Sequence, residues 1–520
     1  MFVRIGEFLA RNTTLVSLIY GVSSILGLIR ESSIAYMFGT TQATDAFLVA
    51  STIPTSITGL ISGTITVTFV TVFGTHIAQG DSEKAWRIAN TMVSLFMVVL
   101  TITAIFLYFF SPYIVSILAP SYSGYQKELT VELTTIMIPN VVFGGLLGIF
   151  VGINNANQSY IAPASIGLIS NIIILVSVFS LGQLVGIHGL AIGMLIGALL
   201  QLLLQIPSAR KKGFNYQLQL NLADSGIKEI IILVIPLVVS AVAGQIYTVI
   251  NRILASGLPS GSISSLYFAD KLVFLPNLFT GAIGTVLFPV IVKYAAVKDW
   301  PRLIEAVIKA VRLLILVLFP AIVGIYVLKN SLISMLFEHG VFTAENTIKT
   351  AEIVPFYLGA LFFGALLSVF VNVYYALKKP VFPVAIGLVT VVANIGFSIL
   401  FIDSLQAKGL ALANSLSVFV NLLLILIGMF LILHLPLKEN IPYLELRNFI
   451  VKTFFSGIFM GIVVSFLYSF ANSKMFLTTH FILGGCIISG IFVYILLIYL
   501  FKIEEVIVSY HWIKRKLGVD

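Results

Sequence analysis

Six charged residues lie inside long apolar stretches of the sequence, namely Arg30, Glu31, Asp45, Arg252, Asp270 and Lys271. A charge held in the middle of a bilayer costs roughly 2.5–3.5 kcal/mol on insertion scales, so residues of this kind usually serve a function. Arginine stays protonated and presents a planar fork of donors that matches phosphate oxygens. The two arginines therefore predict an anionic substrate, and a pyrophosphate group suits such a pair.

The same residues also have structural interpretations, which the sequence leaves open. Asp45 stands at the start of an expected helix, where a carboxylate complements the helix dipole. Lys271 could reach the membrane surface on its long stem, and Asp270 could be the partner of a neighbouring cation. Arg30 and Arg252 could each form a structural ion pair, but their equivalent positions in a repeat favour a shared role in binding.

The apolar stretches that carry these charges are long enough to cross a bilayer. Apolar residues make up 59% and charged residues 10% of the 520 positions, against about 45–50% and 25% in soluble domains. The sequence therefore predicts an all-α polytopic membrane protein with about fourteen transmembrane helices. We expect these helices near 13–38, 44–73, 86–110, 129–156, 160–182, 186–206, 225–257, 264–296, 307–328, 350–377, 381–402, 407–433, 446–470 and 477–503.

The distribution of basic residues predicts how the helices are oriented. With the N-terminus in the cytoplasm, 22 of the 30 Lys and Arg residues fall in cytoplasmic segments, five in outer loops and three inside spans. This asymmetry follows the positive-inside rule and favours an even number of helices. We therefore expect a multi-pass protein of the cell (inner) membrane with both termini cytoplasmic. The net charge of +9 then reflects topology and contact with anionic lipid headgroups, and no nucleic-acid partner is predicted.

The sequence contains an internal repeat. Matched Pro, Gly and Arg residues recur in the same order, which is harder to obtain by chance than matches of Leu or Ile. The pairs are Arg30 and Arg252, Pro54 and Pro276, Gly59 and Gly281 at a spacing of 222, then Phe150 and Phe370, Pro163 and Pro383, Gly189 and Gly409 at a spacing of 220.

The repeat predicts how the chain is organised. We expect an N-lobe of six helices over 1–206, a C-lobe of six helices over 207–433, and a last part over 434–520 that holds two helices and a cytoplasmic tail. Because each repeat has an even number of helices, the lobes share one orientation and are related by an axis along the membrane normal. Such a pair of lobes favours a transporter that works by alternating access, with Arg30 and Arg252 on opposite walls of one cavity.

The motifs of common membrane-associated enzymes are absent from the sequence. It has no Walker-type phosphate loop and no H-E-x-x-H helix. The longest expected loops, near 207–224 and 329–349, are too short to form a catalytic domain. We expect a protein that is not an enzyme, needs no cofactor and binds no metal.

Several segments along the whole chain resemble the MurJ/MviN family of the MOP exporter superfamily. In the first half they are the run from Ser23 to Glu31, then Ala43-Thr44-Asp45-Ala46-Phe47 and Pro54. In the second half they are Ser260-Gly261-Ser262-Ile263-Ser264, Tyr267-Phe268-Ala269-Asp270-Lys271, Gly284-Thr285-Val286-Leu287-Phe288-Pro289 and the loop from Phe337 to Thr343.

The resemblance implies fourteen helices and a function. Members of the family flip lipid II, the undecaprenyl-pyrophosphate-linked peptidoglycan precursor, from the cytoplasmic to the periplasmic leaflet. The resemblance also implies that helices 13 and 14 form a groove for the lipid tail, and that a central cavity is lined by Arg30, Asp45, Arg252 and Asp270. The implied partners are this lipid and the surrounding membrane lipids, with the protein a monomer that associates with cell-wall synthesis proteins.

The sequence departs from the family pattern at four positions. Glu31 replaces the usual Asp, and Lys271 stands where Arg is common. Ser24 and Thr58 occupy positions where the family often carries arginines. The predicted cavity is therefore less cationic than usual, which affects the identity of the headgroup more than the class of substrate.

Other functions remain as alternatives at this point. A related exporter could move a different lipid-linked oligosaccharide, of the O-antigen or exopolysaccharide type. A cation-coupled drug exporter would need a cavity dominated by carboxylates, whereas the paired arginines favour an anion. A scaffold of the cell-wall synthesis machinery would leave the charges inside the membrane unexplained.

Overall fold

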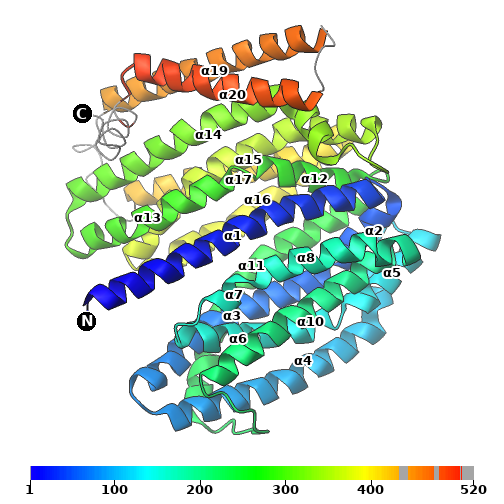
Figure 1. Ribbon diagram of the computed structural model, residues 1–520, viewed down its shortest axis with the longest axis vertical. Coiled ribbons are helices and arrows are strands. Elements are labelled where there is room, and N and C mark those ends of the chain that lie inside the picture. Colours follow the sequence, from blue (N-terminus) through cyan, green and yellow to red (C-terminus); the bar gives the residue numbers. More distant parts are fainter. Residues whose placement is uncertain (1, 432–442, 474–478, 504, 506–520) are drawn as a thin grey trace. The chain divides into compact units, whose positions relative to one another are not determined.

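A computed structural model describes residues 2–431, 443–473, 479–503 and 505. Helices make up nearly all of these residues, and no strand occurs among them. The chain forms two compact units, the first made of Met1–Ser264 with His339–Thr343 and the second of Ser265–Glu338 with Ala344–Asp520. Figure 1 labels the helices along the chain.

The first unit contains eleven helices and the start of a twelfth within the described chain. They are α1 (Phe2–Phe38), α2 (Gln42–Ala50), α3 (Thr52–Ala78), α4 (Ser82–Leu118), α5 (Gly124–Met137), α6 (Asn140–Ala156), α7 (Ile161–Ala164), α8 (Ile166–Phe179), α9 (Leu181–Val185), α10 (Ile187–Lys211), α11 (Ser225–Ser256) and the first turn of α12 (Ser262–Val273). Helix α3 packs on α6, α1 packs on α8, and α10 packs on both α6 and α8. A cluster of buried apolar side chains, including Phe69, Phe73 and Ile88, joins α3 and α4 to α6.

The second unit continues α12 and adds the helices that follow it. They are α13 (Asn277–Ala296), α14 (Trp300–Phe337), α15 (Ala344–Ala376), α16 (Val381–Leu405), α17 (Ala407–Leu431), α19 (Tyr443–Ser473) and α20 (Thr479–Leu500). Helices α19 and α20 lie side by side and pack on α14 (Figure 1). An ion pair between Arg312 of α14 and Glu505, just after α20, joins them at one end.

The structure confirms the expected fold class. Within the described residues each of the fourteen predicted stretches is helical, and twelve stretches are long and apolar enough to cross a bilayer. The ends of two predicted stretches, 432–433 and 477–478, lie outside the described residues. Four stretches are divided into two or more consecutive helices, and prolines lie at or beside several of the breaks, as at Pro139 and Pro276. Proline lacks a backbone N–H and favours such interruptions. The loop expected near 329–349 is shorter than predicted, since α14 and α15 continue past the apolar run and leave only 338–343 between them.

Backbone geometry confirms the repeat. Gly39 and Gly261, 222 residues apart, have φ angles of 57° and 85°. At the spacing of 220, Gly186 and Gln406 have φ angles of 61° and 51°, and Gln158 and Lys378 both have 56°. A positive φ is uncommon away from glycine. Its recurrence at matched positions shows that both halves make the same turns.

An interhelical hydrogen bond recurs at the same spacing with different side chains. In the first unit the Asn154 carboxamide donates to the Gln205 carbonyl at 3.2 Å. In the second unit the Tyr374 hydroxyl donates to the Ile425 carbonyl at 2.9 Å. Tyr374 lies 220 positions after Asn154, and Ile425 lies 220 positions after Gln205. The two halves therefore join their fourth and sixth helices at the same point of the backbone.

Helix α11 is packed differently from the helix it repeats. The repeat makes α11 the counterpart of α1, the first helix of its half, yet α11 packs on α3 and α4 within the first unit. The compact units therefore divide near 264, while the boundaries at 206 and 433 mark the predicted repeats and stay predictions. As a result, Arg30 and Arg252 both belong to the first unit.

Candidate functional site

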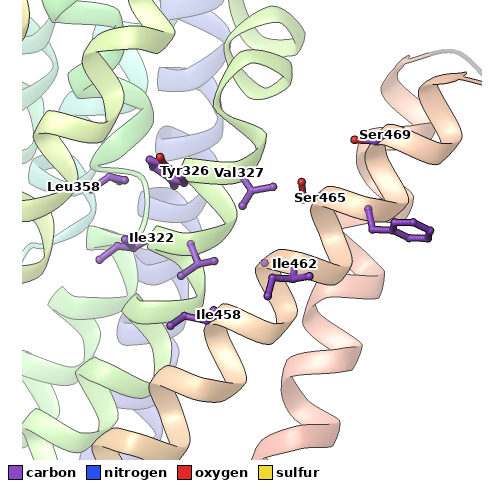
Figure 2. Close-up of a pocket in the computed structure, with 11 residues that line it drawn as sticks. Ile322, Tyr326, Val327, Leu358, Ile458, Ile462, Ser465 and Ser469 are labelled. Atoms are coloured by element: carbon purple, nitrogen blue, oxygen red, sulfur yellow. The ribbon is translucent and has the colours of Figure 1, made fainter.

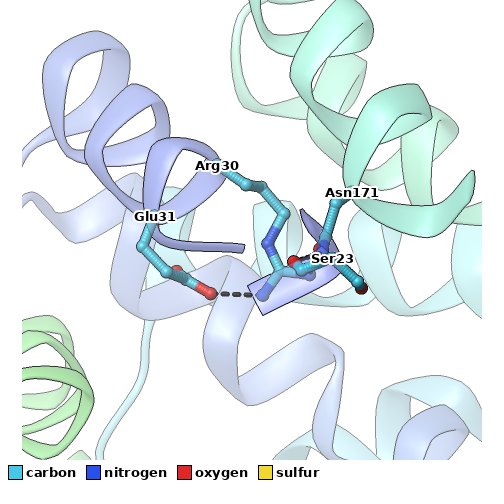
Figure 3. A network of polar contacts seen from close by, with 4 residues as sticks. All are labelled: Ser23, Arg30, Glu31 and Asn171. Carbon is cyan, nitrogen blue, oxygen red and sulfur yellow. Dashed lines mark hydrogen bonds and ion pairs between the residues drawn. The ribbon is translucent and has the colours of Figure 1, made fainter. Parts of the chain in front are cut away.

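Arg30 is held by polar groups on two helices. It lies on α1, and its guanidinium forms an ion pair with Glu31 on the same helix. A second guanidinium nitrogen donates to the Asn171 side-chain oxygen of α8 at 2.9 Å. The Asn171 amide in turn donates to the Ser23 carbonyl at 2.7 Å. Figure 3 shows these four side chains converging between α1 and α8.

This network leaves Arg30 fixed but not enclosed. The Glu31 side chain is 4% exposed, whereas that of Arg30 keeps 23% of its surface accessible. A carboxylate and a neutral amide satisfy part of its donor set, and a guanidinium carries five N–H groups. Arg30 thus forms the structural ion pair that the sequence left open as an alternative, here with Glu31. Its guanidinium is also a partly accessible cation inside a spanning helix.

Asp45 stabilises the start of a helix that is distant in sequence. Asp45 lies in the first turn of α2 and is only 2% exposed. Its carboxylate accepts hydrogen bonds from the Gly261 backbone N–H at 2.6 Å and from the Ser264 backbone N–H at 2.7 Å. The Ser264 hydroxyl donates a third, also at 2.7 Å. Because the first N–H groups of a helix have no partner within it, Asp45 acts as a cap for α12.

Two loops pack against the end of α1 close to this cap. The Val341 N–H donates to the Tyr36 carbonyl at 2.8 Å. Gly340 has a φ of 61°, and a Cβ atom there would lie 2.3 Å from the Tyr36 oxygen. Gly261 has a φ of 85°, and a Cβ atom there would lie 2.6 Å from the Thr40 oxygen. Both positions therefore require glycine, because the chains meet at backbone distance.

Arg252 belongs to the same polar region as Asp45. The Arg252 guanidinium of α11 is half-buried and attracts the Asp45 carboxylate electrostatically. Both groups also affect the pKa of Tyr122, which lies between α4 and α5. Burial and then the nearby Asp45 carboxylate raise the pKa of Tyr122, and Arg252 partly offsets this shift. The structure thus brings Asp45, Arg252 and Tyr122 together in the first unit.

Asp270 and Lys271 lie on α12 in the second unit. Both are half-buried. The Lys271 ammonium stands 4.8 Å from the centre of the Tyr267 ring, one helical turn earlier, within the range of a cation–π contact. Among the residues that the structure describes, no group of three or more His, Cys, Asp or Glu side chains could hold a metal ion.

A largely apolar cavity of about 730 Å³ lies between α14 and α19, with Leu358 of α15 contributing to its wall. Figure 2 shows Ile322 and Val327 of α14 facing Ile458 and Ile462 of α19. The hydroxyls of Tyr326, Ser465 and Ser469 are the polar groups of the lining. The cavity suits a hydrocarbon chain better than a charged group.

These features define a helical membrane transporter with a duplicated fold and partly buried arginines inside its spans. The family model described as "Lipid II flippase MurJ" matches residues 34–484. The chain belongs to this lipid II flippase family, as its resemblance to MurJ/MviN sequences indicated.

Curated relatives and solved structures agree with this assignment. The chain is 27% identical over 477 residues to a probable lipid II flippase of Buchnera aphidicola subsp. Baizongia pistaciae, covering 89% of this chain and 90% of the relative. It is 29% identical over 412 residues to that of Bdellovibrio bacteriovorus, covering 78% and 79%. A solved lipid II flippase in an inward closed conformation has a TM-score of 0.79 at 26% identity, covering 94% and 98%.

A more distant structural neighbour shows only a shared fold. An inward-facing multidrug resistance transporter of the MATE family in the MOP superfamily has a TM-score of 0.64 at 13% identity, covering 78% of this chain and 93% of the other. This likeness carries no argument about substrate.

Sequence reasoning missed the groups that hold the charged residues. Asn171 lies in an otherwise apolar run, where one amide is a weak signal. The donors to Asp45 at Gly261 and Ser264 are more than 200 positions away from it along the chain. The best signal for these donors was the run Ser260-Gly261-Ser262-Ile263-Ser264, which resembles the family pattern. This run forms the turn that Asp45 caps.

The capping role of Asp45 predicts a loss of stability on substitution. Asp45→Ala leaves two backbone donors at the start of α12, Gly261 and Ser264, without their acceptor, at a cost of about 1–3 kcal/mol each. We expect a clear fall in the thermal unfolding midpoint in detergent, and a smaller fall for Asp45→Asn, which keeps one acceptor oxygen. Asp403→Ala, at an exposed carboxylate of α16, is the control. A midpoint for Asp45→Ala equal to that of the control would contradict the capping role.

Proposed function

We propose that the protein is a flippase that moves an undecaprenyl-pyrophosphate-linked saccharide, lipid II, from the inner to the outer leaflet by alternating access. The observation that carries this proposal is the match of residues 34–484 to the lipid II flippase family. The partly accessible arginine inside a spanning helix supports it, because an anionic headgroup needs a cation along its path. The chain thus functions as a transporter in the synthesis of the cell wall.

Arg30 and Arg252 are proposed to bind the diphosphate. A guanidinium can donate two parallel hydrogen bonds to phosphate oxygens. Glu31 and Asn171 orient Arg30 through the contacts described above, and Asp45 balances the charge of Arg252 until the substrate arrives. Asp270 and Lys271 stay predicted substrate-binding residues of the second unit.

The lipid tail is proposed to follow the cavity between α14 and α19. Its lining is dominated by Ile, Val and Leu side chains, and burial of each methylene of a tail contributes about 0.8 kcal/mol. The tail can therefore remain in an apolar environment while the headgroup crosses among polar side chains. The proposed tail site thus lies beside α19, which is helix 13 of the predicted fourteen.

The membrane potential supplies a driving force for this movement. An inside-negative potential favours export of an anion by about 2.3 kcal/mol per charge per 100 mV. A diphosphate headgroup would gain this energy for each charge that crosses. That the transporter is a monomer, and that it associates with cell-wall synthesis proteins, stay predictions.

We propose a location in the cytoplasmic membrane with both ends of the chain on the cytoplasmic side. The 22-to-5 division of basic residues supports this orientation. It predicts that Lys349, an exposed residue of α15, faces the outside and that exposed Lys212 faces the cytoplasm.

Single-cysteine labelling tests this orientation. In a Cys486→Ala background, which removes the one native thiol, Lys349→Cys should react with a membrane-impermeant maleimide in intact spheroplasts. Lys212→Cys should react only after permeabilisation. The reverse pattern, or equal labelling of both, would contradict the proposed orientation.

The arginines give the sharpest test of substrate binding. Removing either guanidinium loses charge-assisted hydrogen bonds of about 1.5–3 kcal/mol each, so flipping by Arg30→Ala and Arg252→Ala should fall more than tenfold. Replacement by Lys keeps the charge without the fork and should recover part of the activity. Membrane abundance and flipping are measured side by side, with Arg302→Ala, at a side chain 68% exposed, as the control.

A second variant separates binding from folding. Arg30→Ala leaves the buried Glu31 carboxylate without its partner, which could lower abundance by itself. Combining Arg30→Ala with Glu31→Ala removes both charges and should restore abundance but not flipping. Normal flipping in both single Ala variants would refute a role for these arginines in substrate binding.

A further inference from the structure

The two halves of the repeat pack the same pair of helices in different ways. In the first unit α3 and α6 meet through three glycines of α6, spaced four residues apart. A Cβ atom built on Gly144, Gly148 or Gly152 would lie 2.0 Å, 2.8 Å or 2.8 Å from an atom of α3. Thr66 of α3 also donates to the Gly148 carbonyl at 3.0 Å. The two helices meet backbone to backbone at Gly148 and Ser62, and side chains of α3 cover Gly144 and Gly152, as in other small-residue helix pairs in membranes.

The equivalent contact in the second unit is open. Adding 220 to the three glycine positions gives Gly364, Ser368 and Asn372 on α15, so two of the three glycines are replaced by polar residues. Here α13 and α15 border a cavity of about 540 Å³. The Thr280 hydroxyl of α13, the repeat equivalent of Thr58, donates to the Asn277 carbonyl of its own helix. The Thr58 hydroxyl of α3 instead donates to the Asn140 carbonyl at the start of α6.

The lining of the cavity combines polar, uncharged groups with apolar surface. Its lining includes the carboxamides of Asn277 and Asn372 and the hydroxyls of Thr280 and Ser368. None of the residues that line it is charged. The Asn372 carboxamide forms no hydrogen bond with another residue of the described chain, so two donors and an acceptor remain available to a ligand.

The remaining walls suit a partly apolar ring. A Cβ atom on Gly284 would meet nothing within 4 Å, so α13 presents bare backbone to the cavity there. Phe288 lies one helical turn further along the same face. Sugars combine hydroxyl groups, which bond to amides and hydroxyls, with C–H faces that pack on aromatic rings. A pyrophosphate would find no cation here, and a hydrocarbon tail would leave the polar groups without partners.

We propose that the cavity between α13 and α15 binds the uncharged saccharide part of the headgroup. This inference rests on the proposed function, because it assigns a second contact to the same lipid-linked substrate. The duplication supports it, since one copy of the helix pair has a closed contact through glycines and the other has polar side chains at two of the same positions. The saccharide site thus lies on helices that do not carry Arg30 or Arg252.

Two purified lipids distinguish this site from the diphosphate site. One is undecaprenyl pyrophosphate that carries its saccharide, and the other is undecaprenyl pyrophosphate alone. Dissociation constants are measured for the full-length protein in detergent micelles. Asn372→Leu removes the free amide, and Gly284→Val fills open space beside it. Each variant should weaken binding of the saccharide-bearing lipid by roughly three- to tenfold and leave binding of the bare pyrophosphate lipid unchanged.

Gly396→Val of α16 is the matched control, because Gly396 also has nothing within 4 Å of its Cβ position and does not line the cavity. Equal weakening of both lipids, or no change for either, would overturn the saccharide site while the proposed function stands. If the unmodified protein bound neither lipid, both the proposed function and this inference would be wrong.

Discussion

The need to satisfy every charge within a spanning helix shapes the first unit more than any other constraint. An unpaired charge at the middle of a bilayer costs roughly 2.5–3.5 kcal/mol. The protein meets this cost with short-range partners: Arg30 has Glu31 and Asn171, and Asp45 has three donors around the start of α12. The resulting contacts tie α1 to α8, and α2 to α12. A transporter built in this way can keep charge on its path only where the surrounding helices hold it in place.

Duplication supplied matched positions without matched partners. Arg30 and Arg252 are equivalent in the repeat, but the position equivalent to Asn171 is Val391, whose side chain has no hydrogen-bonding group. Arg252 instead interacts with Asp45 across α11 and α2 within the first unit. The glycine contacts of α6 and the polar cavity beside α15 differ in the same manner. The repeat therefore supplied the same backbone positions to both halves, while the groups that surround these positions differ between the halves.

Much of the architecture was predictable because the membrane imposes it. Runs of about 20 apolar residues located all fourteen helical stretches, and spaced Pro, Gly and Arg residues revealed the repeat. The capping of α12 by Asp45 was not predictable from local pattern, since its donors lie 216 and 219 positions away. The packing of α11 on α3 and α4 was also unforeseen, because apolar periodicity does not say which neighbour a helix selects. The site residues were recognisable as unusual charges, whereas their partners were ordinary polar residues.

The central claim is that this chain carries a lipid-linked peptidoglycan precursor across the cytoplasmic membrane. Its most direct test is depletion of the protein in its own cells, followed by measurement of which undecaprenyl-linked lipid accumulates and in which leaflet. Our account predicts that lipid II accumulates in the inner leaflet and that wild-type protein reverses this, whereas the Arg30→Ala protein does not. Accumulation of a different lipid-linked oligosaccharide, or an unchanged distribution of lipid II between the leaflets, would contradict it.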